Sequence, residues 1–156
     1  MRNMTNHNCM PVLDETIKHF IQGQKIATIC CTDEQNDPFC FSCFYSFQSK
    51  DCLLQFKSSA ASRHCRLMAE KPRVSGTILP DKLNIFSVAG IQFSGTLLYA
   101  SHELTEDASW LYHIKFPFAL AVPGEVFAVY IETITLTVMK NGFSKKLCFQ
   151  RNENSI

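Results

Sequence analysis

The sequence lacks any apolar run near the roughly 18 residues that a membrane-spanning helix needs. Its first eight residues are polar, and no apolar segment of a secretory signal follows them. The formal net charge is only +1, so the strongly basic surface that nucleic-acid binding requires is missing too. We therefore expect a cytoplasmic protein with neither a membrane nor a nucleic acid as partner.

Linkers, internal repeats and low-complexity tracts are also absent from the sequence. A chain of 156 residues fits one domain that is large enough for a real core. We expect a disordered leader over residues 1–10, one domain over 11–151 and a flexible tail over 152–156.

The eight cysteines lack the spacing of a metal site. Cys40 and Cys43 have CxxC spacing, but an odd offset within a strand sends two side chains to opposite faces. Cys30 and Cys31 diverge in the same way, and no second pair completes a four-ligand zinc site. Because thiols stay reduced in unexported proteins, we expect mostly free cysteines that are buried as small hydrophobic residues.

Signatures of hydrolytic and metal catalysis are missing as well. No Gly-x-Ser-x-Gly occurs, and no histidine lies at ligand spacing from another histidine, a cysteine or an acidic residue. The sequence therefore names no catalytic residue and predicts no metal site.

What the sequence does contain is a series of β-rich segments with short polar turns between them. We interpret them as six or so antiparallel strands of a closed or split β-barrel. Gly90 and Gly95 predict bends or bulges in the fifth segment. The segments span residues 25–32, 39–47, 52–57, 73–79, roughly 84–99 and 126–138, with a tail strand over 146–151.

Three helices are expected, one before the first strand and two between later strands. Apolar residues at helical spacing predict the first over 11–22, ended by Gly23. A second, over 62–71, must end at Pro72. Thr105 is a plausible N-cap of the third, which Phe116-Pro117 stops.

The most informative segment lies where the third strand meets the second helix. There an apolar strand runs into small hydroxyl residues, followed by an Arg-His pair. Hydroxyls, free N–H groups at a helix start and a guanidinium together can hold a phosphate group. A solvated serine-rich turn capped by an arginine would have the same composition. The candidate phosphate ligands are Lys57, Ser58, Ser59, Ser62, Arg63 and His64.

Two of these residues have specific expected roles. Ser62 would be the N-cap of the helix, which leaves N–H groups aimed at the anion. Arg63 would be the anchor, because its planar guanidinium suits bidentate recognition of oxygen atoms.

This segment resembles the phosphate-binding segment of the pyridoxamine 5′-phosphate oxidase-like, FMN-binding split-barrel superfamily. In that pattern an aromatic-Thr-Asn sequence ends a strand and Ser-Arg-Lys begins a helix. Ser58, Ser62 and Arg63 match it, whereas His64 replaces the lysine. Gly-x-Gln-Phe-x-Gly at 90–95, Phe-Pro at 116–117 and Gly-Phe-x-Lys-Lys at 142–146 are similar to a small uncharacterised bacterial branch. The resemblance covers about residues 24–151.

The resemblance implies a mainly β fold, a six-stranded antiparallel split β-barrel that binds FMN. It also implies a homodimer with each flavin at the subunit interface. The flavin ring would lie along a strand before the phosphate segment, over residues 42–47, against Cys43, Phe44 and Tyr45. Gln92 would substitute for a glutamine that reaches the flavin in the oxidases.

The chain departs from the oxidases at two charged positions. Ser42 and Phe47 stand where the oxidases have an arginine and a lysine. Lys57, or Lys145 or Lys146 of a second subunit, could supply the missing positive charge. A solvated Lys-Lys pair in a hairpin is the alternative for the last two.

The resemblance predicts an FMN-dependent oxidoreductase, with NAD(P)H as a candidate hydride donor. The chain has no Arg-Leu-x-Pro tail of the kind that holds pyridoxamine phosphate, so we do not expect it to oxidise that substrate. Two alternatives remain open. One is a haem-binding or haem-degrading split barrel with His64 or a residue of the tail as the candidate axial ligand. The other is a flavin-binding module without catalysis.

Overall fold

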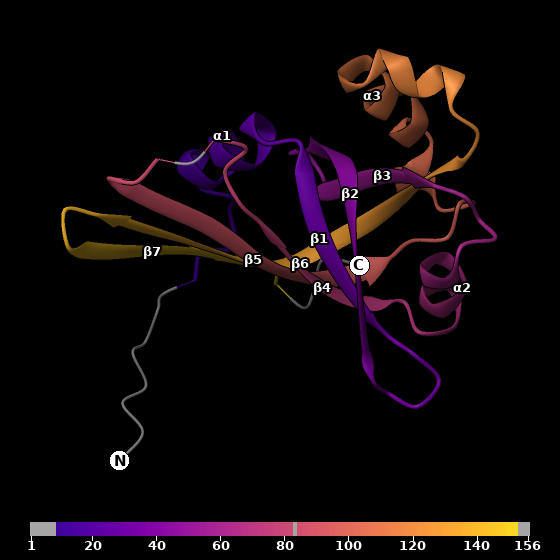
Figure 1. Cartoon of the computed structure of the whole chain (residues 1–156), viewed down its shortest axis with the longest axis horizontal. Helices are drawn as coiled ribbons and strands as arrows, with labels where there is room; N and C mark the ends of the chain where they lie inside the picture. Colours follow the sequence, from indigo (N-terminus) through magenta and orange to yellow (C-terminus); the bar gives the residue numbers. More distant parts are fainter. Residues whose placement is uncertain (1–8, 83, 153–156) are drawn as a thin grey trace.

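A computed structural model of the chain describes residues 9–82 and 84–152. Residues 1–8 of the predicted leader and 153–156 of the predicted tail lie outside the described residues. Seven antiparallel strands form one sheet in the order β3-β2-β1-β4-β5-β6-β7, and β3 also pairs with β6 (Figure 1). The strands are β1 (Ile26–Thr32), β2 (Pro38–Gln48), β3 (Leu53–Ser58), β4 (Arg73–Ile78), β5 (Ser87–Leu97), β6 (Glu125–Lys140) and β7 (Phe143–Gln150).

The pairing of β3 with β6 joins six strands into a closed ring, and β7 continues from β6 outside it. The predicted mainly β, six-stranded antiparallel barrel is therefore confirmed, with the tail strand as a seventh. The fifth segment bends where predicted, because the register of β5 on β6 shifts between Ser94 and Gly95. A Cβ atom at Gly95 would collide with the carbonyl oxygen of Tyr130, so only glycine fits there. Gly90 lies in regular pairing.

Over the described residues, one α-helix precedes the first strand, and two further α-helices and two 3-10 helices lie between later strands. They are α1 (Glu15–Gly23), α2 (Arg63–Glu70), η1 (Glu103–Thr105), α3 (Ala108–Lys115) and η2 (Pro117–Ala121). The first helix starts later than residue 11, because Asp14 is its N-cap and accepts a 2.7 Å hydrogen bond from the Thr16 amide. Thr105 is not the predicted cap. It ends η1, and α3 begins only after Asp107.

The core lies inside the ring and at one mouth of it. Alternate residues of the strands point inward, and Ile17 and Ile21 of α1 pack against them, both at most 2% exposed. A smaller cluster lies outside the ring, where Tyr112 of α3 and Phe116 pack over the strands. Helix α3 thus covers the outer face of β2, β3 and β6.

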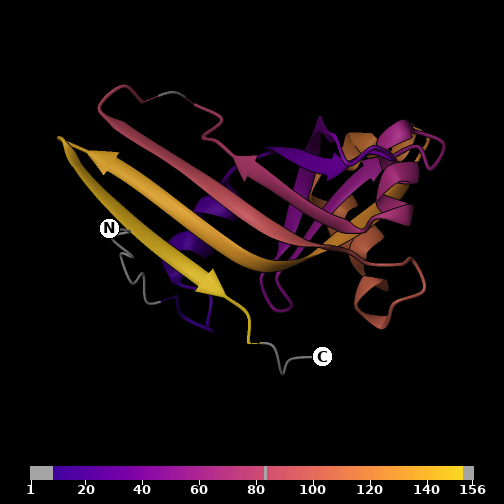
Figure 2. The ribbon, with the colours of Figure 1, turned by 90° about the horizontal axis from the view of Figure 1, so that it is seen from below.

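The far ends of β5, β6 and β7 extend beyond the ring, and we call residues 84–90 and 137–146 the arm. Figure 2 shows these strands running out to one side, away from α2. An Asn141-Gly142 turn with positive φ angles of 52° and 78° joins β6 to β7. This tight turn lets β7 begin at Phe143, earlier than the predicted residue 146. Large apolar side chains are exposed on the arm, namely Ile85, Phe86, Val88, Met139 and Phe143.

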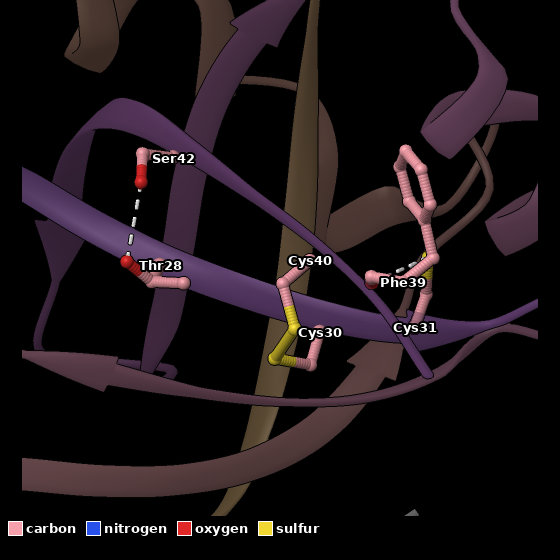
Figure 3. The surroundings of a disulfide bond; sticks show 6 residues. All are labelled: Thr28, Cys30, Cys31, Phe39, Cys40 and Ser42. Carbon is pink, nitrogen blue, oxygen red and sulfur yellow. Dashed lines mark hydrogen bonds between the residues drawn. A yellow bond between two sulfur atoms is a disulfide. The ribbon is translucent and has the colours of Figure 1, made fainter. Parts of the chain in front are cut away.

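The expectation of mostly free cysteines is wrong for four of the eight. Cys30 of β1 lies directly opposite Cys40 of β2, with Cα atoms 4.1 Å apart, and the two form a disulfide (Figure 3). Cys9 forms another with Cys148 of β7. The reason is strand register, which spacing along the sequence does not reveal. The free cysteines are Cys31, Cys43, Cys52 and Cys65, and all but Cys43 are buried.

The Cys9–Cys148 disulfide lies where the described chain begins. Met10 pairs with Phe149 of β7 through a parallel bridge, and its amide donates to the Cys148 carbonyl at 3.2 Å. Residues 9 and 10 of the predicted leader are therefore attached to β7. Among the described residues, no helix has both the length and the apolarity to span a bilayer.

Candidate functional site

The end of β3 and the start of α2 bring three predicted ligands together. The Nε2 atom of His64 lies 2.8 Å from the hydroxyl oxygen of Ser58 and 3.1 Å from that of Ser62. The two hydroxyl oxygens are 3.3 Å apart. We call Ser58, Ser62 and His64 the serine–histidine cluster. It offers three polar groups around one point, as a phosphate site requires.

The His64 ring is fixed by stacking. It lies parallel to the Phe41 ring of β2, with centroids 3.8 Å apart and planes 15° apart. Burial lowers the pKa of His64 below its ordinary value, because the cationic ring loses hydration. The ring is therefore mainly neutral at pH 7, and an anion beside it would favour protonation.

The helix start provides backbone donors next to this cluster. Ser62 is the N-cap of α2, as predicted, with an extended backbone at φ −65° and ψ 150°. Its side chain makes no capping hydrogen bond, because the hydroxyl faces His64 instead. The first-turn N–H groups of α2 therefore have no side-chain cap and retain their attraction for an anion.

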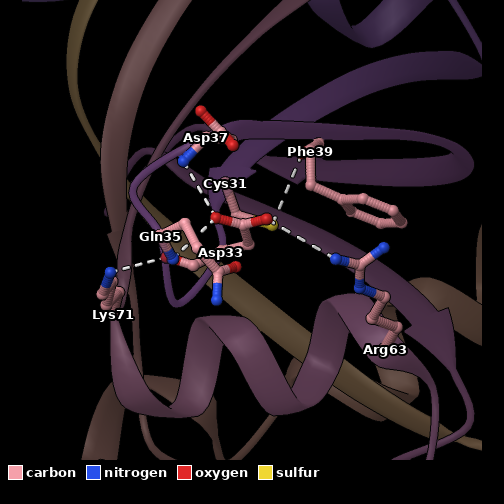
Figure 4. A network of polar contacts seen from close by, with 7 residues as sticks. All are labelled: Cys31, Asp33, Gln35, Asp37, Phe39, Arg63 and Lys71. Atoms are coloured by element: carbon pink, nitrogen blue, oxygen red, sulfur yellow. Dashed lines mark hydrogen bonds and ion pairs between the residues drawn. The ribbon is translucent and has the colours of Figure 1, made fainter.

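Arg63 points away from the cluster toward the β1–β2 turn. Its guanidinium lies 3.6 Å from the Asp33 carboxylate and stacks over Phe39 at 4.6 Å (Figure 4). Asp33 is 9% exposed and also accepts hydrogen bonds from the amides of Gln35 and Asp37, at 3.0 and 2.9 Å. The Arg63 side chain is 55% exposed, so part of its donor set still faces solvent.

Two other predicted phosphate ligands lie outside the cluster. Lys57 points to the opposite face of β3 from Ser58, since neighbouring strand residues alternate. Its ammonium donates to the Ala119 carbonyl at 2.7 Å and lies 3.2 Å from Nε2 of His113, beneath α3 and η2. Ser59 is exposed, and its hydroxyl accepts from the Ala61 amide at 3.3 Å.

The strand expected to lie along the flavin ring presents one aromatic side chain outward. Tyr45 is fully buried and donates a 2.6 Å hydrogen bond to the Ile21 carbonyl, and burial raises its pKa. Burial likewise raises the pKa of the half-buried Cys43 thiol to about 12. Phe44 is 44% exposed, and the centroid of its ring lies 5.5 Å from that of Phe116 and 5.9 Å from that of Phe118. Phe44 is therefore the member of this trio that could face a planar ligand.

The remaining predicted ligands are distant within one chain. Gln92 is exposed on β5, between Thr77 and Thr135 of the neighbouring strands. Lys145 and Lys146 are exposed on the arm. Ser58 pairs with the first residue of β6, whereas Lys146 pairs with Thr137, so about 40 Å of strand separates the two positions at roughly 3.3 Å per residue. The two lysines could reach a serine–histidine cluster only from another subunit.

Sequence reasoning missed Asp33 and Phe41. Asp33 begins a polar turn, where an aspartate commonly bonds its own backbone, so its pairing with Arg63 had no separate signal. Phe41 alternates in phase with Phe39, which predicts a shared face but not a ring partner.

Comparisons with known proteins identify relatives and a fold. No protein-family model matches the chain. Among solved structures, a haem-binding protein from Mycobacterium smegmatis matches with TM-score 0.65 and 15% identity over 80% of this chain and 52% of that one. The chain thus spans about half the length of that protein. A FAD-binding protein from Mesorhizobium loti matches with TM-score 0.64 and 17% identity over 83% and 96%. A haem storage protein from Vibrio cholerae matches with TM-score 0.60 and 18% identity over 78% of this chain and 91% of that one.

At these identities the structural matches establish the fold, a split barrel, and nothing finer. The sequence relatives are closer. A UPF0306 protein from Photorhabdus laumondii is 31% identical over 137 residues, which are 88% of this chain and 95% of the relative. Another UPF0306 protein, from Yersinia pseudotuberculosis, is 30% identical over 137 residues, which are 88% of this chain and 92% of the relative. The match runs through nearly the whole of both proteins, and the chain belongs to the UPF0306 family.

Proposed function

We propose that this chain is an FMN-binding flavoprotein whose phosphate site is the serine–histidine cluster at the start of α2. The observation that carries the proposal is the meeting of Ser58, Ser62 and His64 at a helix start that has no side-chain cap. Oriented hydroxyls, free N–H groups and a ring that can gain charge suit a dianionic phosphate. The FAD-binding protein of Mesorhizobium loti shares the fold.

Each residue has a defined part in this proposal. The two serine hydroxyls donate to phosphate oxygens, and His64 donates from Nε2 once protonated. Arg63 can add its free donors, or leave Asp33 for the stronger charge of a phosphate. Bound FMN would supply hydride transfer, with NAD(P)H as the proposed donor, which makes the protein an oxidoreductase. The chain's own residues bind and orient the flavin.

The assembled form in this proposal is a homodimer with a flavin at each subunit junction. The arm of one subunit then brings Lys145 and Lys146 toward the cluster of the other. This arrangement explains why two lysines and a row of apolar side chains lie exposed far from the ring.

Titration of the purified protein with FMN tests the proposal, with riboflavin as the matched ligand without phosphate. Quenching of FMN fluorescence and shifted flavin absorption bands are expected, with riboflavin bound at least tenfold more weakly. Ser62→Ala should weaken FMN binding and leave riboflavin binding unchanged. No spectral change with FMN, or equal affinity for the two flavins, would exclude the phosphate site.

Haem binding is the second candidate, because two proteins of the same fold bind or store haem. An axial histidine would need a free ring nitrogen, whereas Nε2 of His64 already faces two hydroxyls and the ring is stacked on Phe41. These contacts favour the flavin. A Soret band on haem addition that disappears in His64→Ala would favour haem instead.

A further inference from the structure

A cavity lies on the outer face of the barrel, away from the serine–histidine cluster. It occupies the space between the end of α1, helix α3 and strands β2 and β3, and its volume is about 230 Å³. At about 30 Å³ per water molecule, it has room for roughly eight waters or one small organic molecule. Its lining consists of Gln22, Ser46, Phe47, Gln55, Leu111 and Lys115.

Gln55 brings an unpaired hydrogen-bond donor to this cavity. The residue is fully buried in the middle of β3, beside apolar neighbours. Its Oε1 atom accepts a 2.6 Å hydrogen bond from the Ser46 hydroxyl, but its Nε2 atom is buried without a partner. Because an unpaired buried amide is costly, an acceptor in the cavity would stabilise it.

Lys115 brings a positive charge to the same cavity. Its ammonium donates to the Gln24 carbonyl at 2.6 Å and lies 3.5 Å from the Gln22 carbonyl, at the end of α1. Among the residues that the structure describes, no carboxylate lies within ion-pair distance of it. Burial lowers the pKa of Lys115, and the opposing effect of the Asp81 carboxylate only partly offsets this.

The apolar part of the lining comes from Phe47 of β2 and Leu111 of α3. A molecule here would therefore meet donors at one side and hydrocarbon at the other. An anionic oxygen group on a short hydrocarbon body matches that division, because the anion satisfies both the amide and the ammonium.

We propose that this cavity binds a small organic carboxylate, whose oxygens accept hydrogen bonds from Nε2 of Gln55 and Nζ of Lys115. The short apolar body of the molecule lies against Phe47 and Leu111. None of these residues belongs to the serine–histidine cluster, so the carboxylate site can be tested independently of the proposed flavin site.

The test is a titration of the full chain with butyrate, followed by the side-chain amide signals in ¹H–¹⁵N NMR spectra. Butyramide, the neutral isostere, is the matched control ligand. Saturable shifts of the Gln55 amide signals, identified by their loss in Gln55→Leu, are expected with butyrate. Butyramide should bind at least tenfold more weakly.

Variants from two separate elements guard against a folding artefact. Gln55→Leu and Lys115→Gln should each weaken butyrate binding at least tenfold. Lys18→Met, which removes a partly exposed charge on α1, should bind butyrate like the wild type. The proposal is overturned if butyrate gives no saturable shift, which would mean a water-filled cavity. It is also overturned if butyramide or inorganic phosphate binds equally well, or if both variants retain the wild-type affinity.

Discussion

The closed ring and the arm contain stretches of the same two strands, β5 and β6, yet their surroundings differ. In the ring both strands have partners on each side, and residues such as Ile131 and Ile134 are 1% exposed. On the arm the same strands carry Val88 and Met139, which are 55% and 52% exposed. The ring holds its own core and a candidate anion site, whereas the arm leaves apolar surface uncovered. One chain therefore accounts for the ring, whereas the exposed apolar side chains of the arm would be covered only in the proposed homodimer.

The sharpest way to test this difference is to remove one phenylalanine from each region. Phe56→Ala should lower the free energy of unfolding by about 3–5 kcal/mol, because the side chain is fully buried against Phe41 and Phe127. Urea titration measures the change. Phe143→Ala is the matched control on the arm, where the side chain is 81% exposed, and monomer stability should change by less than about 0.5 kcal/mol. Equal losses of unfolding free energy in the two variants would contradict the difference between the ring and the arm.

Arg63→Ala tests the anion site of the ring. Loss of a charge-assisted hydrogen bond should weaken FMN binding by about 1.5–3 kcal/mol, measured by fluorescence titration. Arg66→Ala, on the same helix and exposed, should leave the affinity near the wild-type value. If both variants bind FMN like the wild type, the phosphate lies elsewhere.

Replacement of Lys145 and Lys146 by alanine tests whether the arm contributes to a partner's site. FMN affinity should fall a few-fold, less than for Arg63→Ala, because exposed charges interact weakly through water. Light scattering should give a dimer of about 35 kDa, twice the 17.7 kDa of the chain. A monomer that binds FMN fully would contradict both the shared site and the role of the arm.

The smallest effect concerns pH. Burial lowers the pKa of His64 in the folded chain, so the unfolded chain takes up its proton first as pH falls. Stability should therefore decrease as pH drops below about 6.5 toward the folded-state value. His64→Gln removes this contribution, so its urea midpoint should fall less between pH 7.5 and 5.5 than that of the wild type. If the urea midpoints of the two proteins fall equally over this pH range, the His64 side chain is more solvated than the structure indicates.

Much of the ring could be predicted from the sequence, because alternating apolar residues and short polar turns fix where strands lie. The position of Ser62 as N-cap followed from the hydroxyl before a helical pattern. Contacts across strands could not be predicted, since they depend on register. The Cys30–Cys40 disulfide and the Arg63–Asp33 ion pair both join segments that only the folded sheet brings together.

Lys57 shows a different kind of limit. Its neighbour Ser58 joins the serine–histidine cluster, and a one-residue offset on a strand sends the lysine to the other face. Charge and proximity in the sequence suggested a shared site, whereas alternation already argued against one. Gln55 lies on the face that Lys57 shares, and nothing in an apolar run of Leu-Leu-Gln-Phe indicated which helix would cover it.

The Cys9–Cys148 disulfide makes the oxidised protein almost a covalent circle. It joins residues 139 positions apart, and their Cα atoms lie 4.8 Å from each other. Where the two ends of a domain meet, the point at which the polypeptide starts is a matter of genetic order more than of architecture. A permuted gene that begins at the exposed Glu34–Gln35 turn, with residue 152 joined to residue 9 by a peptide linker so that all of β7 is kept, could therefore encode the same barrel.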